Sequence, residues 1–142
     1  MNGAAPQQHD HQHDHGAGHD PQWDVVVVGG GAAGLAAALQ LGRSRRSVLV
    51  VDAGEPRNAP ATHLHGYLGH DGLPPSELLR IGRDEVRAYG VEVVDGAVVD
   101  ISGDPGGPFR LALADGTSRS ARRVLLATGL VDELPDVPGV AD

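Results

Sequence analysis

A buried strand, a tight turn and the start of a helix are encoded together in Asp24-Val25-Val26-Val27-Val28-Gly29-Gly30-Gly31-Ala32-Ala33-Gly34. Four consecutive valines suit a strand buried on both faces, as in a covered parallel sheet, where polar and apolar residues need not alternate. Gly29 allows the turn, Gly31 lets backbone N–H groups approach phosphate oxygens, and Gly34 lets the helix pack close to the strand. The segment therefore predicts a site for the pyrophosphate of a dinucleotide.

The residues that follow complete a βαβ unit. A helix is expected from about Ala32 to Leu41, with its positive N-terminal end directed at the pyrophosphate. A second apolar run then ends at Asp52, which is where the adenosine ribose should lie. A carboxylate there accepts hydrogen bonds from ribose hydroxyls and repels a 2′-phosphate, by about 4 kcal/mol per charge pair at 4 Å and an effective dielectric near 20. The unit predicts FAD or NAD as the ligand, not NADP.

Composition limits the classes of function. The chain has 142 residues, which support one domain, and no cysteine, which excludes disulfides, thiolate metal sites and a CxxC motif within it. Its net charge of −8 and scattered arginines argue against nucleic acid as a partner. No apolar stretch approaches the length of a membrane span and no leader precedes the first strand, so we expect a cytoplasmic protein with no membrane partner.

The first 22 residues differ from the rest. Five histidines alternate there with aspartates, in a composition too polar to form a core, so this tail is predicted to be disordered. Loose binding of zinc, nickel or copper by the tail is an alternative to a simple solvated segment, which we favour. No metal site is assigned.

The remaining chain predicts a long loop, a helix and further strands. Residues 53–73 lack any period and contain polar and aromatic groups suited either to line a cofactor or to lie on the surface: Arg57, Asn58, His63, His65, Tyr67 and His70. A helix should open at Pro74 and be capped by Gly90, followed by a core strand over 91–94.

Antiparallel hairpins are expected next. Strands are predicted over 97–101 and 109–114 and from Thr117 onward, with a separate last strand over 124–127. The predicted fold is α/β, a three-layer Rossmann-like domain with a mainly parallel sheet and a small antiparallel meander. No triad or carboxylate pair stands at a defensible spacing, so no catalytic residue is assigned.

The order of these motifs carries a family resemblance. GGGAAG, the segment 50–58, the meander and Leu125-Leu126-Ala127-Thr128-Gly129 resemble the FAD-binding part of the thioredoxin-reductase-like pyridine nucleotide-disulfide oxidoreductases, over residues 23–142. The loop 57–69 and the segment 132–136 further resemble the branch that includes bacterial and fungal dithiol oxidases acting on disulfide natural products.

The resemblance implies FAD as the cofactor and a set of contacts to it. The pyrophosphate would meet the glycine-rich turn, the ribose Asp52, the adenine Val98, and the isoalloxazine the segment 63–69. The candidate residues are Gly29, Gly31, Ala32, Ala33, Gly34, Asp52, Arg57, Asn58, His65, Val98, Ala127, Thr128 and Gly129.

Family members continue into a domain that binds NADPH and then return to finish the FAD domain. Since this chain ends at Asp142, where that connection would begin, we expect a truncated domain, incomplete at its C-terminus. The implied activity is an oxidoreductase that uses NADPH or NADH and FAD to reduce a disulfide or another acceptor. The alternatives are a non-catalytic nucleotide-binding fragment, whose exposed apolar surface favours a homodimer or other association, and a single-domain NAD-binding protein with a metal-binding tail.

Overall fold

The computed structural model describes residues 21–54 and 62–130 of the chain. The predicted disordered tail, except for its last two residues, and the candidates Arg57 and Asn58 lie outside these residues. Eight elements follow one another along the chain: β1 (Gln22–Val28), α1 (Ala32–Arg43), β2 (Val48–Asp52), α2 (Pro75–Ala88), β3 (Glu92–Asp95), β4 (Val98–Ser102), β5 (Phe109–Leu113) and β6 (Ser118–Leu126).

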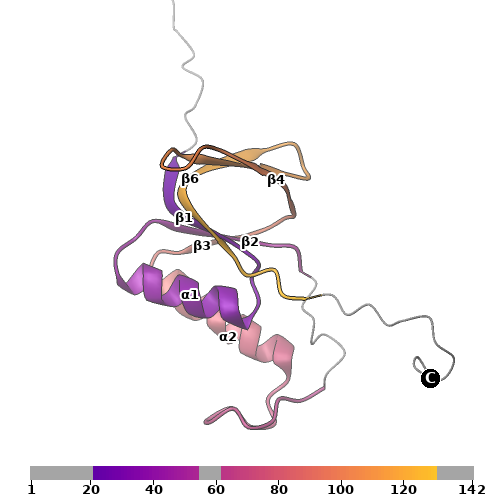
Figure 1. The fold of residues 1–142 in the computed structure, drawn as a ribbon. Coiled ribbons are helices and arrows are strands. Elements are labelled where there is room, and N and C mark those ends of the chain that lie inside the picture. Colours follow the sequence, from indigo (N-terminus) through magenta and orange to yellow (C-terminus); the bar gives the residue numbers. More distant parts are fainter. Residues whose placement is uncertain (1–20, 55–61, 131–142) are drawn as a thin grey trace, which may run out of the picture.

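The strands form one six-stranded sheet in the order β3-β2-β1-β6-β5-β4. Strand β1 lies between β2 and β6 and is parallel to both, and β2 is parallel to β3. Strands β4, β5 and β6 are antiparallel neighbours. In Figure 1 the two helices lie on one side of β1, β2 and β3, while β4 and β6 arch over the other side. The three layers, the parallel sheet and the meander confirm the predicted fold class.

Strand β6 corrects the predicted strand pattern. The sequence predicts one strand from Thr117 and another over 124–127, but the structure has a single strand, Ser118–Leu126. Its first half pairs with β5, from Ala112 opposite Ser118 onward, and the stretch from Ser120 to Leu126 pairs with β1. One strand therefore joins the meander to the parallel sheet.

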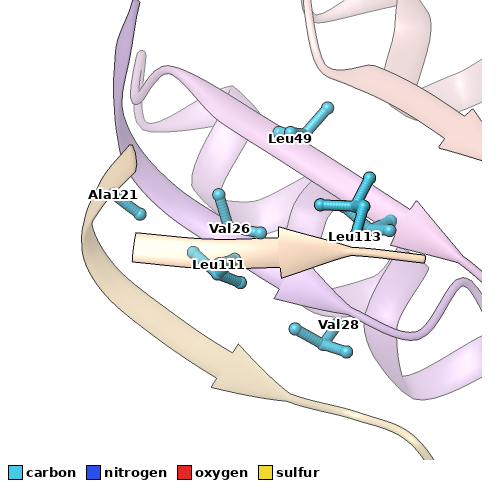
Figure 2. Packing of buried hydrophobic residues seen from close by; sticks show 7 residues of the cluster. Val26, Val28, Leu49, Leu111, Leu113 and Ala121 are labelled. Carbon is cyan, nitrogen blue, oxygen red and sulfur yellow. The ribbon is translucent and has the colours of Figure 1, made fainter. Parts of the chain in front are cut away.

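Alternation along β1 divides the core into two clusters. Val26 and Val28 face the meander, where they pack with Leu49, Leu111 and Leu113 (Figure 2). Val27 faces the helices, among a second set of buried residues: Leu35, Ala38, Val48, Val50, Val86 and Val91. Both faces of β1 are covered, which is why its valines run without interruption.

Helix α2 ends in a glycine cap. After α2, Gly90 takes φ +78°, its N–H donates to the Arg87 carbonyl, and the Val91 N–H donates to the Val86 carbonyl. This is the Schellman arrangement, so the predicted cap at Gly90 is confirmed.

Helix α1 extends two residues past the expected end, to Arg43. Within the described ranges, neither helix has the length and apolar character needed to cross a membrane.

Candidate functional site: a groove at the ends of the parallel strands

A groove of about 790 Å³ opens where the parallel strands β1, β2 and β6 end. Small-molecule sites usually occupy about 300–1,000 Å³, and open α/β sheets bind ligands at the carboxyl ends of their strands. Most of the candidate residues line this groove: Gly29, Gly31, Ala32, Ala33, Asp52, Val98, Ala127, Thr128 and Gly129. The structure thus brings together residues from four separate parts of the sequence.

Gly29 joins the three strand ends. Its φ is +112°, and a Cβ there would overlap the carbonyl group of Ala127. The Gly29 N–H donates to the Val51 carbonyl at 2.8 Å, and the Ala127 N–H donates to the Val28 carbonyl at 2.8 Å. A side chain at Gly29 would therefore separate β1 from β6 at the floor of the groove.

Gly34 and Gly31 differ in what surrounds them. A Cβ at Gly34 would overlap the Gly29 carbonyl oxygen, so this glycine allows the close packing of α1 on β1 and lies behind the groove lining. A Cβ at Gly31 would meet no atom of the described chain within 4 Å and would project into open space. A glycine that the fold itself does not require there fits a position kept free for a ligand.

The start of α1 supplies hydrogen-bond donors to the groove. Helix α1 begins at Ala32, with Gly31 as the N-cap residue. The first N–H groups of a helix have no partner within the helix, and the helix dipole places partial positive charge at this end. The amides of Ala32 and Ala33 are therefore placed to bind an anionic group such as a pyrophosphate.

Asp52 lies at the end of β2 with 13% of its side chain exposed. Its Oδ1 accepts hydrogen bonds from the backbone N–H groups of Gly30 and Gly54, each at 3.2 Å. Its Oδ2 accepts a hydrogen bond from the guanidinium of Arg83, which also lies 3.4 Å from Asp95 Oδ1. The carboxylate is held on both oxygens at the edge of the groove.

Two further charged groups of the groove come from α2. Arg83 and Arg80 both line the groove, and no sequence motif predicts either of them as a site residue. Arg80 forms ion pairs with Glu77 at 2.7 Å and Asp84 at 2.9 Å. The hydrogen bond with Glu77 raises the pKa of Arg80 and lowers that of the Glu77 carboxyl, so this pair is charged at neutral pH.

His65 is not among the residues that line the groove. Its side chain is 82% exposed, and its Nδ1 lies 4.0 Å from Asp71 Oδ1. The loop around it closes on itself, with the Leu64 N–H donating to the Leu73 carbonyl and the Gly72 N–H donating to the Leu64 carbonyl. Contact of residues 63–69 with a flavin stays a prediction. In the described part of the chain, no three histidine or acidic side chains form a metal-binding group.

The strand-turn-helix geometry, the helix N-terminus at the groove and the carboxylate at the end of β2 are those of a Rossmann-like domain. The chain belongs to the pyridine nucleotide-disulphide oxidoreductase family, whose model matches residues 23–142.

Several known proteins are similar to the chain. It is 38% identical over 125 residues to the thioredoxin reductase aclD of Aspergillus oryzae, covering 86% of this chain and 40% of that protein. The crystal structure of HlmI matches with 51% identity and a TM-score of 0.79, over 87% of this chain and 40% of that one. An oxidoreductase from Agrobacterium tumefaciens matches with 43% identity and a TM-score of 0.79, over 85% and 41%. The chain therefore spans about two fifths of the length of these relatives.

Proposed function

We propose that the groove binds FAD and that the chain is the FAD-binding part of an NAD(P)H-dependent oxidoreductase that acts on a disulfide or another acceptor. Bound FAD would supply the two-electron chemistry between the nicotinamide donor and that acceptor. The observation that carries the proposal is the open position at Gly31 beside the first amides of α1, since a phosphate can approach the backbone there.

The other residues of the groove have roles that follow from their positions. The Ala32 and Ala33 amides would donate to the pyrophosphate, and Asp52 would accept from a ribose hydroxyl. The backbone of Val98 would lie beside the adenine. The segment from Ala127 to Gly129 lines the opposite side of the glycine turn and would contact the cofactor through its backbone.

The nature of the acceptor is supported by the relatives. Fungal and bacterial relatives are named thioredoxin reductases, with identities of 26–38% to this chain. Together with the resemblance of the loop 57–69 to dithiol oxidases, this supports a disulfide or a dithiol as the reacting group in the whole protein. We place this activity in the cytoplasm. Self-association is also part of the proposal, because Leu126 and Leu130 beside the groove are 68% and 69% exposed.

The test is the visible absorption spectrum of the chain, purified without flavin and recorded again after incubation with FAD and desalting. A retained flavin spectrum is expected. Equilibrium dialysis against NAD and NADP provides the matched comparison, since a single-domain NAD-binding protein would retain NAD and ignore FAD. Failure to retain FAD by a chain whose circular dichroism shows folded α/β structure would contradict the proposal.

A further inference from the structure

We propose that Arg83 is a positioning residue for Asp52 and that it leaves Oδ2 of this carboxylate as the acceptor for a ribose hydroxyl. The inference rests on the proposed function, because it concerns how the same groove would recognise the adenosine ribose of FAD. Arg83 and Asp52 both line the groove and are 26% and 13% exposed in their side chains. Their hydrogen bond is therefore only partly accessible to solvent.

The lone pairs of Asp52 determine which oxygen remains available. Each carboxylate oxygen can accept about two hydrogen bonds. Oδ1 already accepts from the backbone N–H groups of Gly30 and Gly54, whereas Oδ2 accepts from Arg83. One accepting position on Oδ2 is left for a ligand.

Arg83 also restrains the orientation of the carboxylate. Rotation about the Cβ–Cγ bond moves both carboxylate oxygens together, so the two amide donors on Oδ1 oppose it from one side. The Arg83 guanidinium opposes the same rotation through Oδ2, so the carboxylate is held at both ends. The groove thus presents a pre-organised acceptor, and a ligand does not have to order it on binding.

Asp95 is a secondary partner of Arg83. Its Oδ1 lies 3.4 Å from Arg83 Nη1, and its side chain is 87% exposed. Ion pairs that are this exposed are weak, so the charge of Arg83 acts mainly on Asp52. With two carboxylates and one guanidinium, the group carries a formal charge of −1.

Arg80 is a matched control for Arg83. It lies one turn earlier on α2 and lines the same groove, but it pairs with Glu77 and Asp84 instead of Asp52. Replacing Arg80 removes the same charge from the groove without removing a hydrogen bond to Asp52. Any effect of charge alone is therefore measured by Arg80→Gln.

The first experiment is a double-mutant cycle on FAD affinity, with Arg83→Gln, Asp52→Asn and the double variant of the full chain. Asp52→Asn should weaken FAD binding about tenfold and Arg83→Gln by about three- to tenfold, since hydrogen bonds to a charged group are strong. The double variant should bind within about twofold of Asp52→Asn, because Arg83 acts through the carboxylate. Arg80→Gln should change the affinity for FAD by the same factor whether residue 52 is aspartate or asparagine. If the losses of FAD affinity in the two single variants multiply in the double variant, Arg83 acts independently of Asp52 and the inference is overturned.

The second experiment needs no FAD. Hydrogen exchange of the Gly30 and Gly54 amides reports how firmly the Asp52 carboxylate is held. Arg83→Gln should speed exchange at both amides severalfold, whereas Arg80→Gln should leave both rates unchanged. Unchanged rates in Arg83→Gln would refute positioning by Arg83. A wild-type chain that retains no FAD would instead refute the proposed function, so the two failures are distinguishable.

Discussion

Gly30 lies directly against the side chain of Asp52: a Cβ at position 30 would stand 2.6 Å from both Cβ and Cγ of the aspartate. The Gly30 N–H also donates to Asp52 Oδ1. Gly30→Ala should therefore push the carboxylate out of its position and weaken FAD binding by more than tenfold. Overpacking of this kind should lower the free energy of unfolding by about 1–3 kcal/mol. Urea unfolding and FAD titration measure the two effects, and an alanine variant with wild-type affinity would show that the carboxylate does not need this space.

Replacement of Gly31 should affect unfolding less than replacement of Gly30. The φ of Gly31, −75°, suits any residue, and its Cβ would meet no described atom within 4 Å. Gly31→Ala should lower the free energy of unfolding by no more than about 1 kcal/mol, because alanine is a poorer N-cap residue than glycine. It should still weaken FAD binding about tenfold or more, because the methyl group would occupy the approach to the helix amides. Unchanged affinity would place the pyrophosphate elsewhere.

The fold was predictable because local signals agree with one another. The valine run of β1, the apolar run of β2 and the glycine after α2 each predict their element by a short-range rule. The continuity of β6 was not predicted, because Arg122 and Arg123 interrupt its apolar pattern. These two residues lie within the register that pairs β6 with β1, and a hydrogen-bonded backbone ladder does not require apolar side chains.

Residue spacing alone predicted the site only within the nucleotide-binding motif, whereas Val98 and residues 127–129 of the groove were implied by the family resemblance. Gly29, Gly31 and Asp52 have fixed spacings, and the structure places them around one groove. Arg83 has no such spacing, because its place beside Asp52 depends on how α2 packs over α1 and β3. Gly30 carried a weak signal, namely a third glycine that the motif does not use. Arg83 and Gly30 were both missed because their roles come from tertiary contacts with the Asp52 carboxylate.

Arg45 is the described residue other than glycine with a positive φ, at +59°. It ends α1 in a Schellman arrangement, with the Arg46 N–H on the Leu41 carbonyl and its own N–H on the Gly42 carbonyl. Because a side chain is disfavoured in this conformation, Arg45→Gly should raise the free energy of unfolding by about 0.5–1 kcal/mol. Arg43→Gly, within the last turn of the helix, should instead lower it by about 1 kcal/mol. Thermal unfolding of both variants measures the difference, and a destabilised Arg45→Gly would contradict the prediction.

Asp24 should make stability depend on acid pH. Its Oδ2 accepts a hydrogen bond from the Ser47 N–H at 3.0 Å, and its own N–H donates to Ser47 Oγ at 2.9 Å. The backbone hydrogen bond from Ser47, followed by the Ser47 hydroxyl and the nearby Arg122, holds the pKa of Asp24 below its usual value of 3.8. A carboxyl whose pKa is lower in the folded state stabilises the fold above its unfolded pKa, and this contribution is lost as the pH falls through the folded pKa.

The matching variant is Asp24→Asn, which keeps the size of the side chain but cannot ionise. Wild type should be more stable than Asp24→Asn near about pH 6, and the difference should shrink as the pH falls below 3.8. Urea unfolding at several pH values measures the difference, with Glu92→Gln as the control for loss of an exposed carboxylate. A difference that stays constant down to about pH 2.5 would mean that the ionised form of Asp24 does not hold the start of β1 to Ser47, and that the reciprocal pair acts only through neutral hydrogen bonds.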